Sequence, residues 1–258
     1  MKRVLGTPMG VRKPRLDIVG VGPGDPELVT PQAVAAIRSA EIVVGWELDL
    51  QPVAPWLKHQ RVFRQTVKNY RRVIRHVARL ARRTRQRVAV PRVGDPCISS
   101  GLKGLLELFH DFDISVISGV SSVQMAAALA TINLDEAALF SFHDYGDQAQ
   151  RADALVEAFR QGRHLVVLAS PDLTPARMAQ FLMDQGLPGQ TQAVVCSNLT
   201  LPDEQVVKGS LSMVARRQFP WLTLSVVINP AVATEAEDRR QWVQWRRRTR
   251  QAANGLDS

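Results

Sequence analysis

The residues best suited to bind a small ligand form a short loop near the start of the chain. Gly20, Gly22 and Gly24 alternate there with other residues, Pro23 lies between the last two glycines, and Asp25 follows. Glycines permit positive φ and let a ligand approach the main chain closely, while proline fixes φ and prevents helix formation. A carboxylate in such a loop can bind an amino or cationic group. The loop therefore indicates a candidate binding site.

The segments on either side of this loop place it between a strand and a helix. Residues 16–21 are mostly apolar, which predicts a buried strand. Thr30 is a good N-cap and Pro31 suits the first helical position, so we expect a helix over 31–38. α/β proteins bind small molecules at the carboxyl ends of such strands. The pattern thus predicts an α/β fold with a site after its first strand.

Two familiar nucleotide-binding motifs do not match the loop. The dinucleotide motif G-x-G-x-x-G would need a glycine where Asp25 stands. The phosphate-binding loop of nucleoside triphosphatases needs a Gly-Lys-Ser or Gly-Lys-Thr sequence, which does not follow here. The alternative to a ligand site is a glycine-rich turn without a ligand, because such loops are common in α/β chains.

Two further loops follow predicted parallel strands. The first is Val93-Gly94-Asp95-Pro96, after the apolar run 87–91, and the second is Gly119-Val120-Ser121-Ser122, after the predicted strand 114–117. Asp95 has an alternative use in capping an Asx turn, and the serines have one in capping the helix predicted over 123–130. In the ligand-binding interpretation, Asp25 and Asp95 lie around a single cleft.

Taken together, the sequences GVGPGDPELVT (20–30), VGDP (93–96) and GVSS (119–122) resemble the tetrapyrrole (corrin/porphyrin) methylase family. The resemblance extends from residue 17 to residue 229 and is strongest to the E-type members, which methylate carbon 5 of cobalt-precorrin-7 or precorrin-6Y in cobalamin biosynthesis. It implies two α/β domains with S-adenosylmethionine, the methyl donor, bound in the cleft between them. The reaction expected is attack of an electron-rich ring carbon on the methyl group of a sulfonium.

The resemblance also implies roles for individual residues. Asp25 and His143 are expected on the substrate side as the candidate catalytic residues. In such a reaction the protein mainly aligns the reactants and excludes water, so neither a metal site nor a nucleophile is expected. The expected donor-binding residues are Pro23, Val93, Gly94, Asp95, Ile98, Ser121, Ser122, Ala169 and Leu199.

Several positions depart from the family pattern. Residues 97–101 read CISSG where the family has an aromatic-glycine pair, and Ser118 replaces a proline. His143 is followed by Asp144 and Tyr145 in place of Gly-Arg, and residues 198–204 carry leucine where the E-type segment has tyrosine. The departure at 97–101 concerns the expected substrate-side contacts, and the one at Ser118 is minor.

Composition and length bound the remaining possibilities. The chain has 258 residues, of which 45% are hydrophobic and 22% charged, as in soluble globular proteins. No apolar run approaches the roughly 20 residues of a membrane span, and the basic start lacks a signal-peptide core, so we expect a cytoplasmic protein. Cys97 and Cys196 show neither a disulfide framework nor metal-ligand spacing. The expected organisation is an extension (1–14), an N-terminal α/β domain (15–130), a C-terminal α/β domain (131–232) and an Arg- and Trp-rich tail (233–258).

Positive charge is concentrated in one stretch. Residues 58–92 contain thirteen Lys and Arg and no acid; because the whole chain carries +9, the remainder carries −4. Apolar residues recur at helical spacing over 66–83, with basic residues on the other face. This face is either simply solvated or recruits an anionic corrinoid through its acetate and propionate arms. Nucleic acid is less expected, because no aromatic residues alternate with the arginines.

Two other functions are compatible with the same resemblance. One is a methyltransferase of this fold that acts on ribosomal RNA, favoured by the basic helix. The other is a non-catalytic, donor-binding partner of a separate carbon-15 methylase and decarboxylase subunit. A homodimer is expected from the family alone.

Overall fold

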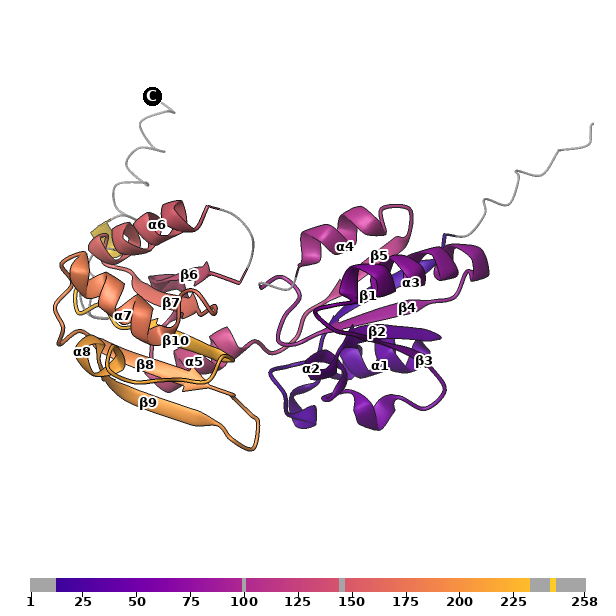
Figure 1. Ribbon diagram of the computed structural model, residues 1–258, viewed down its shortest axis with the longest axis horizontal. Coiled ribbons are helices and arrows are strands. Elements are labelled where there is room, and N and C mark those ends of the chain that lie inside the picture. Colours follow the sequence, from indigo (N-terminus) through magenta and orange to yellow (C-terminus); the bar gives the residue numbers. More distant parts are fainter. Residues whose placement is uncertain (1–12, 99–100, 144–146, 233–241, 245–258) are drawn as a thin grey trace, which may run out of the picture.

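The computed structural model describes residues 13–98, 101–143, 147–232 and 242–244, which form two α/β units side by side (Figure 1). Each unit contains a five-stranded sheet, so the expectation of two α/β domains is confirmed. The predicted extension and tail fall almost entirely outside the described residues. Within those residues, no helix is both long and apolar enough to cross a membrane.

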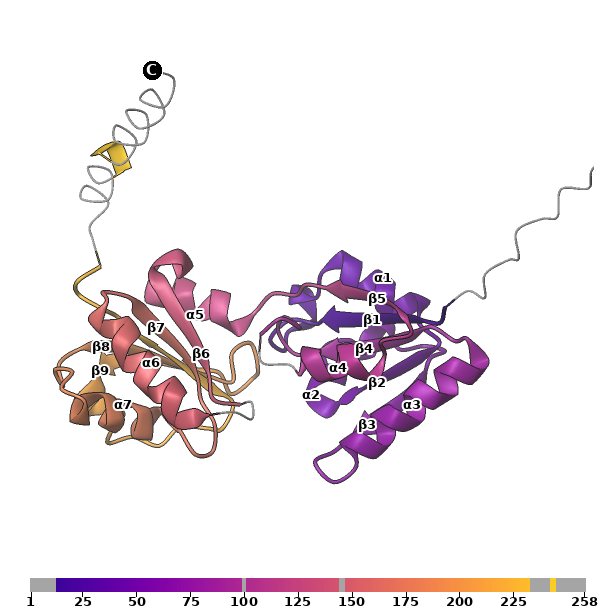
Figure 2. The same cartoon turned by 90° about the horizontal axis from the view of Figure 1, so that it is seen from above.

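The N-terminal sheet is entirely parallel, with the strand order β3-β2-β4-β1-β5. Helix α1 (Pro31–Ser39) covers one face, and α3 (Tyr70–Thr84) and α4 (Leu102–Leu108) cover the other, as Figure 2 shows from above. Because both faces are covered, the central strands β1, β2 and β4 are almost entirely buried, whereas the edge strands β3 and β5 are partly exposed. Their carboxyl ends meet at one edge of the sheet. The strands are β1 (Arg15–Gly20), β2 (Ile42–Trp46), β3 (Arg61–Gln65), β4 (Val88–Arg92) and β5 (Asp113–Ile117).

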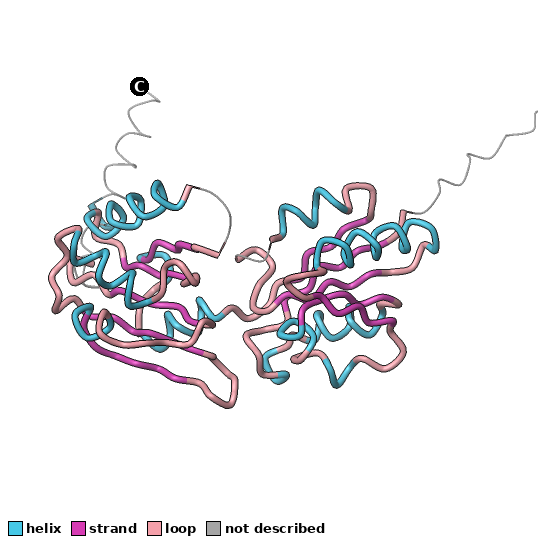
Figure 3. The backbone as a smooth tube through the Cα atoms, viewed as in Figure 1, coloured by secondary structure: helices cyan, strands magenta, loops and turns pink. Residues whose placement is uncertain are grey.

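The C-terminal sheet is mixed, with the strand order β6-β7-β10-β8-β9. Strands β6 and β7 pair in parallel, and the other pairs are antiparallel. Helices α6 (Gln148–Arg160), α7 (Pro175–Asp184) and α8 (Leu211–Val214) share a hydrophobic core with this sheet (Figure 3). The strands are β6 (Ala137–Ser141), β7 (His164–Leu168), β8 (Gln192–Ser197), β9 (Gln205–Ser210) and β10 (Thr223–Val227).

Helix α5 (Ser122–Ala130) corrects the predicted domain boundary. The sequence places this helix in the N-terminal domain, but Val123 and Ala126 share a buried cluster with Val166 and Val194 of the second sheet. The apolar side of α5 covers the face of that sheet opposite α6 and α7, and Figure 1 shows the helix beside the second unit. The N-terminal unit therefore ends before Ser122.

Two local predictions are also wrong. The segment 46–65 has no clean apolar period, which predicts a loop or short helical turns; the short helix α2 (Glu47–Leu50) agrees with this prediction, but the edge strand β3, which pairs in parallel with β2, does not. The helix predicted to begin at Thr66 begins at Tyr70 instead, because the Asn69 carboxamide accepts a hydrogen bond from the Thr66 N–H at 2.7 Å and closes a turn. Val67, one of the apolar residues at helical spacing over 66–83 and therefore expected on the buried face, is 81% exposed as a result.

Three glycines bring the loops after β1, β4 and β5 into backbone contact. A Cβ atom added to Gly20 would lie 2.4 Å from the Gly119 nitrogen and 2.8 Å from the Gly94 carbonyl oxygen. The Gly94 N–H donates to the Gly22 carbonyl at 2.7 Å, which fixes the first two loops to each other. Only glycine allows main chains to approach this closely.

We predict that Gly20→Ala lowers the free energy of unfolding by about 1–3 kcal/mol, because the new methyl group meets backbone atoms that have no rotamer to adopt. Urea denaturation measures the change. Gly104→Ala is the matched control, since Gly104 lies within α4 with no atom within 4 Å of the added Cβ. Alanine there should be neutral or stabilising by up to about 1 kcal/mol. Equal effects of the two substitutions would contradict the close packing at Gly20.

Candidate functional site

Asp95 connects two of the loops at the carboxyl edge of the N-terminal sheet. One carboxylate oxygen accepts the Cys97 N–H at 2.8 Å, and the other accepts the Gly119 N–H at 3.1 Å. The first bond is the Asx turn anticipated as the alternative role, and the second crosses to the loop after β5. Each carboxylate oxygen has lone pairs left for a ligand. Asp95 therefore shapes the candidate site whether or not it also contacts a ligand.

The loop after β5 ends in the N-cap of α5. The buried Ser121 hydroxyl accepts the Val123 N–H at 3.2 Å, and the Gln124 side chain accepts the Ser121 N–H at 2.8 Å, so the two residues form a capping box. Gly94 faces this cap: a Cβ at Gly94, which has φ of 69°, would lie 3.8 Å from the Ser121 hydroxyl oxygen. The structure thus brings Gly94 and Ser121 together, with Ser122 as the first residue of the helix.

The first glycine loop contacts the second domain. The Asp25 N–H donates to the Thr200 hydroxyl at 3.0 Å, and a Cβ on Gly24 would lie 2.6 Å from the Leu201 side chain. The Asp25 carboxylate accepts the Glu27 N–H at 2.9 Å and caps the short 3-10 helix Pro26–Leu28. Pro23 is buried within this loop. The β1 loop and the loop after β8 therefore face each other across the domain boundary.

An apolar cluster joins the two domains beside these polar contacts. Ile98, from the loop after β4, packs against a cluster that contains Leu199 and Val123 of the second unit. Ala169 lies directly after β7, is buried, and donates its N–H to the Thr223 carbonyl at 3.2 Å. The predicted donor-side residues thus come from both domains.

The structure describes His143 but not the three residues that follow it. Its side chain is exposed just beyond β6, and its N–H donates to the Ser141 hydroxyl at 3.3 Å. Residues 144 and 145, where the chain departs from the family pattern, lie outside the described residues. A substrate-side role for His143 stays a prediction.

Asp49 is a buried residue of this edge that the sequence analysis did not single out. Its carboxylate accepts the Val93 N–H at 2.9 Å, the Trp46 N–H at 3.1 Å and the Arg92 guanidinium at 3.0 Å. It thereby ties the carboxyl ends of β2 and β4 to the loop that contains Gly94. The sequence signal for this role is an aspartate three residues after Trp46, at the N3 position of a capping box, in a stretch without a clean apolar period.

The two cysteines do not have the environment of nucleophiles. The pKa of the Cys97 thiol is raised by desolvation and by the negative charge of Asp95. Burial raises the pKa of Cys196 to about 11, so this thiol stays protonated at neutral pH. Among the described residues, no cluster of three or more His, Cys, Asp or Glu is arranged to hold a metal ion. The arrangement described here is suited to binding and aligning a ligand.

Comparisons with known proteins agree with this architecture. The family model described as Tetrapyrrole (Corrin/Porphyrin) Methylases matches residues 15–215. The chain is 30% identical over 210 residues to the probable cobalt-precorrin-7 C(5)-methyltransferase of Methanocaldococcus jannaschii, which covers 81% of this chain and 95% of that protein.

Two solved structures share the fold. The precorrin-6Y methylase of cobalamin biosynthesis from Archaeoglobus fulgidus has a TM-score of 0.63 and 24% identity, over 84% of this chain and 99% of that chain. The uroporphyrin-III C-methyl transferase of Thermus thermophilus, solved with S-adenosyl homocysteine, has a TM-score of 0.64 and 23% identity, over 83% and 97% of the two chains.

We predict that Asp49→Ala lowers the free energy of unfolding by about 3–5 kcal/mol, because it leaves the Arg92 guanidinium buried without its carboxylate. Glu47→Ala, in the same short helix, removes the exposed pair with Arg64 and should change stability by less than about 1 kcal/mol. Chemical denaturation of both variants measures the difference. A small loss for Asp49→Ala would show that this carboxylate does not hold the edge together.

Proposed function

Because this chain belongs to the tetrapyrrole (corrin/porphyrin) methylase family, we propose that it transfers the methyl group of S-adenosylmethionine to ring carbon 5 of cobalt-precorrin-7 or precorrin-6Y. Family membership makes it an S-adenosylmethionine-dependent tetrapyrrole methyltransferase. The observation that carries the choice of carbon 5 is the 30% identity to the M. jannaschii protein along nearly its whole length.

The loops at the domain boundary have the properties needed to hold the donor. Gly22 and Gly94 both have positive φ, and the hydrogen bond from the Gly94 N–H to the Gly22 carbonyl makes the two loops a fixed main-chain surface on which a donor can lie. The N-terminus of α5 suits the donor's carboxylate through the Ser122 N–H and the helix dipole, since the Ser121 N–H already donates to Gln124. The family resemblance implies that apolar residues contact the donor as well, namely Pro23, Val93, Ile98, Ala169 and Leu199.

The chemistry makes modest demands on the protein. When bound, S-adenosylmethionine supplies a methyl group already activated on a positively charged sulfur. The chain's own contribution is then to orient the two reactants and to exclude water from the boundary between its domains. Asp95 and Asp49 hold the loops that perform this orientation.

The proposed substrate-side residues have separate tasks. Asp25 holds its loop against Thr200 and Glu27, so it positions this side of the cleft. His143 is exposed at the end of β6 and is suited to accept a proton or to bind a ring carboxylate. The homodimer, the separate carbon-15 subunit and the cytoplasmic location belong to the proposal through the family resemblance alone.

The Asp95→Ala variant tests the donor site. We expect it to weaken binding of S-adenosylhomocysteine at least tenfold by calorimetry and to cost about 1–3 kcal/mol of stability, because the Cys97 and Gly119 N–H groups lose their acceptor. Asp113→Ala is the control, since Asp113 is an exposed carboxylate at the opposite end of β5. Unchanged affinity in a folded Asp95→Ala protein would remove Asp95 from the donor site.

The reaction itself is tested by incubating the protein with methyl-labelled S-adenosylmethionine and cobalt-precorrin-7. Label should appear in the corrinoid by mass spectrometry. If the protein binds donor but transfers no label to the corrinoid, the next substrate to test is ribosomal RNA, which the basic face of α3 favours. Donor binding without transfer to either substrate would favour the non-catalytic, donor-binding alternative, and a protein that does not bind the donor would contradict the proposed function.

A further inference from the structure

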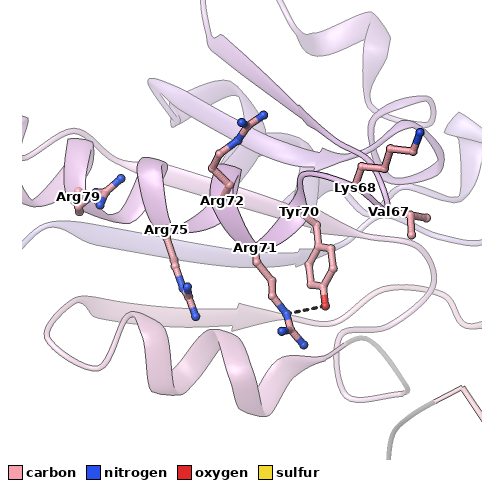
Figure 4. A pocket seen from close by; sticks show the side chains of 7 residues that line it. All are labelled: Val67, Lys68, Tyr70, Arg71, Arg72, Arg75 and Arg79. Carbon is pink, nitrogen blue, oxygen red and sulfur yellow. Dashed lines mark hydrogen bonds between the residues drawn. The ribbon is translucent and has the colours of Figure 1, made fainter.

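A hollow of about 540 Å³ lies on the N-terminal half of α3, apart from the candidate donor site (Figure 4). Beside the ring of Tyr70, five cationic side chains line it, and all five residues are exposed. We call this surface the cationic hollow. Its cationic residues are Lys68, Arg71, Arg72, Arg75 and Arg79.

Within the part of the chain that the structure describes, no acidic side chain pairs with these charges. Residues 58–92 contain no acid, and among the described residues none of the five cations forms a salt bridge. Arg82, one turn further along, is different: it binds Asp111 and the Leu108 carbonyl, each at 2.7 Å. The hydrogen bond from Arg82 lowers the pKa of the Asp111 carboxyl. Of the arginines of α3, Arg82 thus has an acidic partner, whereas the cations of the cationic hollow have none among the described residues.

This arrangement is unfavourable for the isolated helix. Arg71, Arg75 and Arg79 follow one another at i, i+4 spacing, where like charges repel. Arg71 and Arg72 also lie in the first turn, where the helix dipole favours acids and the sequence has none. A surface of a single sign raises the local concentration of an oppositely charged ligand. The charge pattern therefore points to an anionic ligand rather than to solvation alone.

The cationic hollow is connected to the edge that carries the donor loops. The rings of Tyr70 and Trp46 are in contact, with their centroids 5.7 Å apart. The backbone N–H of Trp46 donates to the Asp49 carboxylate. Asp49 in turn accepts the N–H of Val93, in the loop beside Gly94. Helix α3 also begins just after the carboxyl end of β3, at this same edge of the sheet. A ligand docked in the cationic hollow is thus held next to the cleft.

The positions of the cationic side chains suit a ligand whose negative charges lie well apart. In Figure 4 the side chains of Arg71 and Arg75 point one way and those of Lys68 and Arg72 the other, so the cations do not converge on one point. Positions 71 to 79 span about 12 Å along α3, and Lys68 lies in the turn before it. A single phosphate or carboxylate would engage only part of this surface, whereas a ligand with several carboxylates on its rim can engage most of it.

Nucleic acid also carries distributed charge, but the cationic hollow lacks a platform for bases. Its one aromatic residue, Tyr70, already contacts Trp46, and the Arg71 guanidinium lies 5.6 Å from the Tyr70 ring centroid. The Arg71 Nε–H also donates to the Tyr70 hydroxyl at 2.9 Å (Figure 4). Binding of single strands usually relies on open aromatic faces. A small polycarboxylate therefore fits better than nucleic acid.

We propose that the cationic hollow docks the rim carboxylates of the tetrapyrrole substrate and delivers it to the neighbouring cleft. This inference rests on the proposed function, because it takes the substrate class from there. It adds a second contact surface for that substrate, outside the cleft. Such a surface acts mainly on the rate of association and on its dependence on salt.

The test compares two triple variants. One is Arg71→Gln, Arg75→Gln and Arg79→Gln; the matched control, Lys208→Gln, Arg216→Gln and Arg217→Gln, removes the same charge from exposed positions of the C-terminal unit. The probe is uroporphyrin, an octacarboxylate tetrapyrrole, titrated by fluorescence at low salt. We expect the α3 variant to bind it at least tenfold more weakly than the control does. The difference should largely vanish in 1 M salt, where the screening length is about 3 Å.

The remaining outcomes separate this inference from the proposed function. Calorimetry with S-adenosylhomocysteine should give the same affinity for both variants, which shows that the fold is intact; the single variant Arg75→Gln serves if the triple one does not fold. Equal uroporphyrin binding by the two triple variants overturns the inference. The inference is also overturned if the protein binds an RNA hairpin more tightly than uroporphyrin and this RNA binding depends on the α3 arginines. Loss of uroporphyrin binding in the α3 variant, together with no methylation of cobalt-precorrin-7 by the unmodified protein, would retain the docking surface and reject the carbon-5 reaction.

Discussion

The backbones at Gly20, Gly94 and Gly119 approach one another more closely than any side chain would permit, and the candidate site depends on this contact. It brings the loops after β1, β4 and β5 together at one edge of a parallel sheet. Asp95 bonds the second loop to the third, and Asp49 bonds the second loop to β2. A donor at this edge would therefore meet a surface of fixed main chain, with few flexible side chains to reorganise on binding.

The two halves of the chain contribute differently to that surface. The N-terminal unit supplies the glycine loops, whereas the second unit supplies Thr200, Leu199 and α5, which contact those loops from across the boundary. Because α5 packs on the second sheet while its N-terminus adjoins Gly94, the helix fixes the two units to each other at the site. An alignment task of the kind that methyl transfer needs is served by such a rigid boundary.

Buried acids and exposed cations of the N-terminal unit have different roles. Carboxylates inside the N-terminal unit are fully engaged: Asp17 pairs with Arg15 and Arg87, and Asp49 pairs with Arg92. On the outer face of α3 the cations of the cationic hollow have no such partners among the described residues. Internal acids thus hold the sheet together, and the unpaired positive charge is left at the surface beside the site, where a polycarboxylate would arrive.

Local sequence determined most of the strand and helix order and the three loops, because apolar runs, Thr-Pro caps and glycine spacing act over a few neighbouring positions. The donor-side and substrate-side roles come from the family resemblance and stay predictions. It did not determine β3, whose short run follows two prolines, nor the exposure of Val67, which depends on a turn closed by Asn69. The side of the boundary on which α5 packs and the buried role of Asp49 were decided only by the tertiary structure. Both depend on surfaces formed by residues distant in the chain, and no local pattern specifies which of two available sheets an apolar helix will cover.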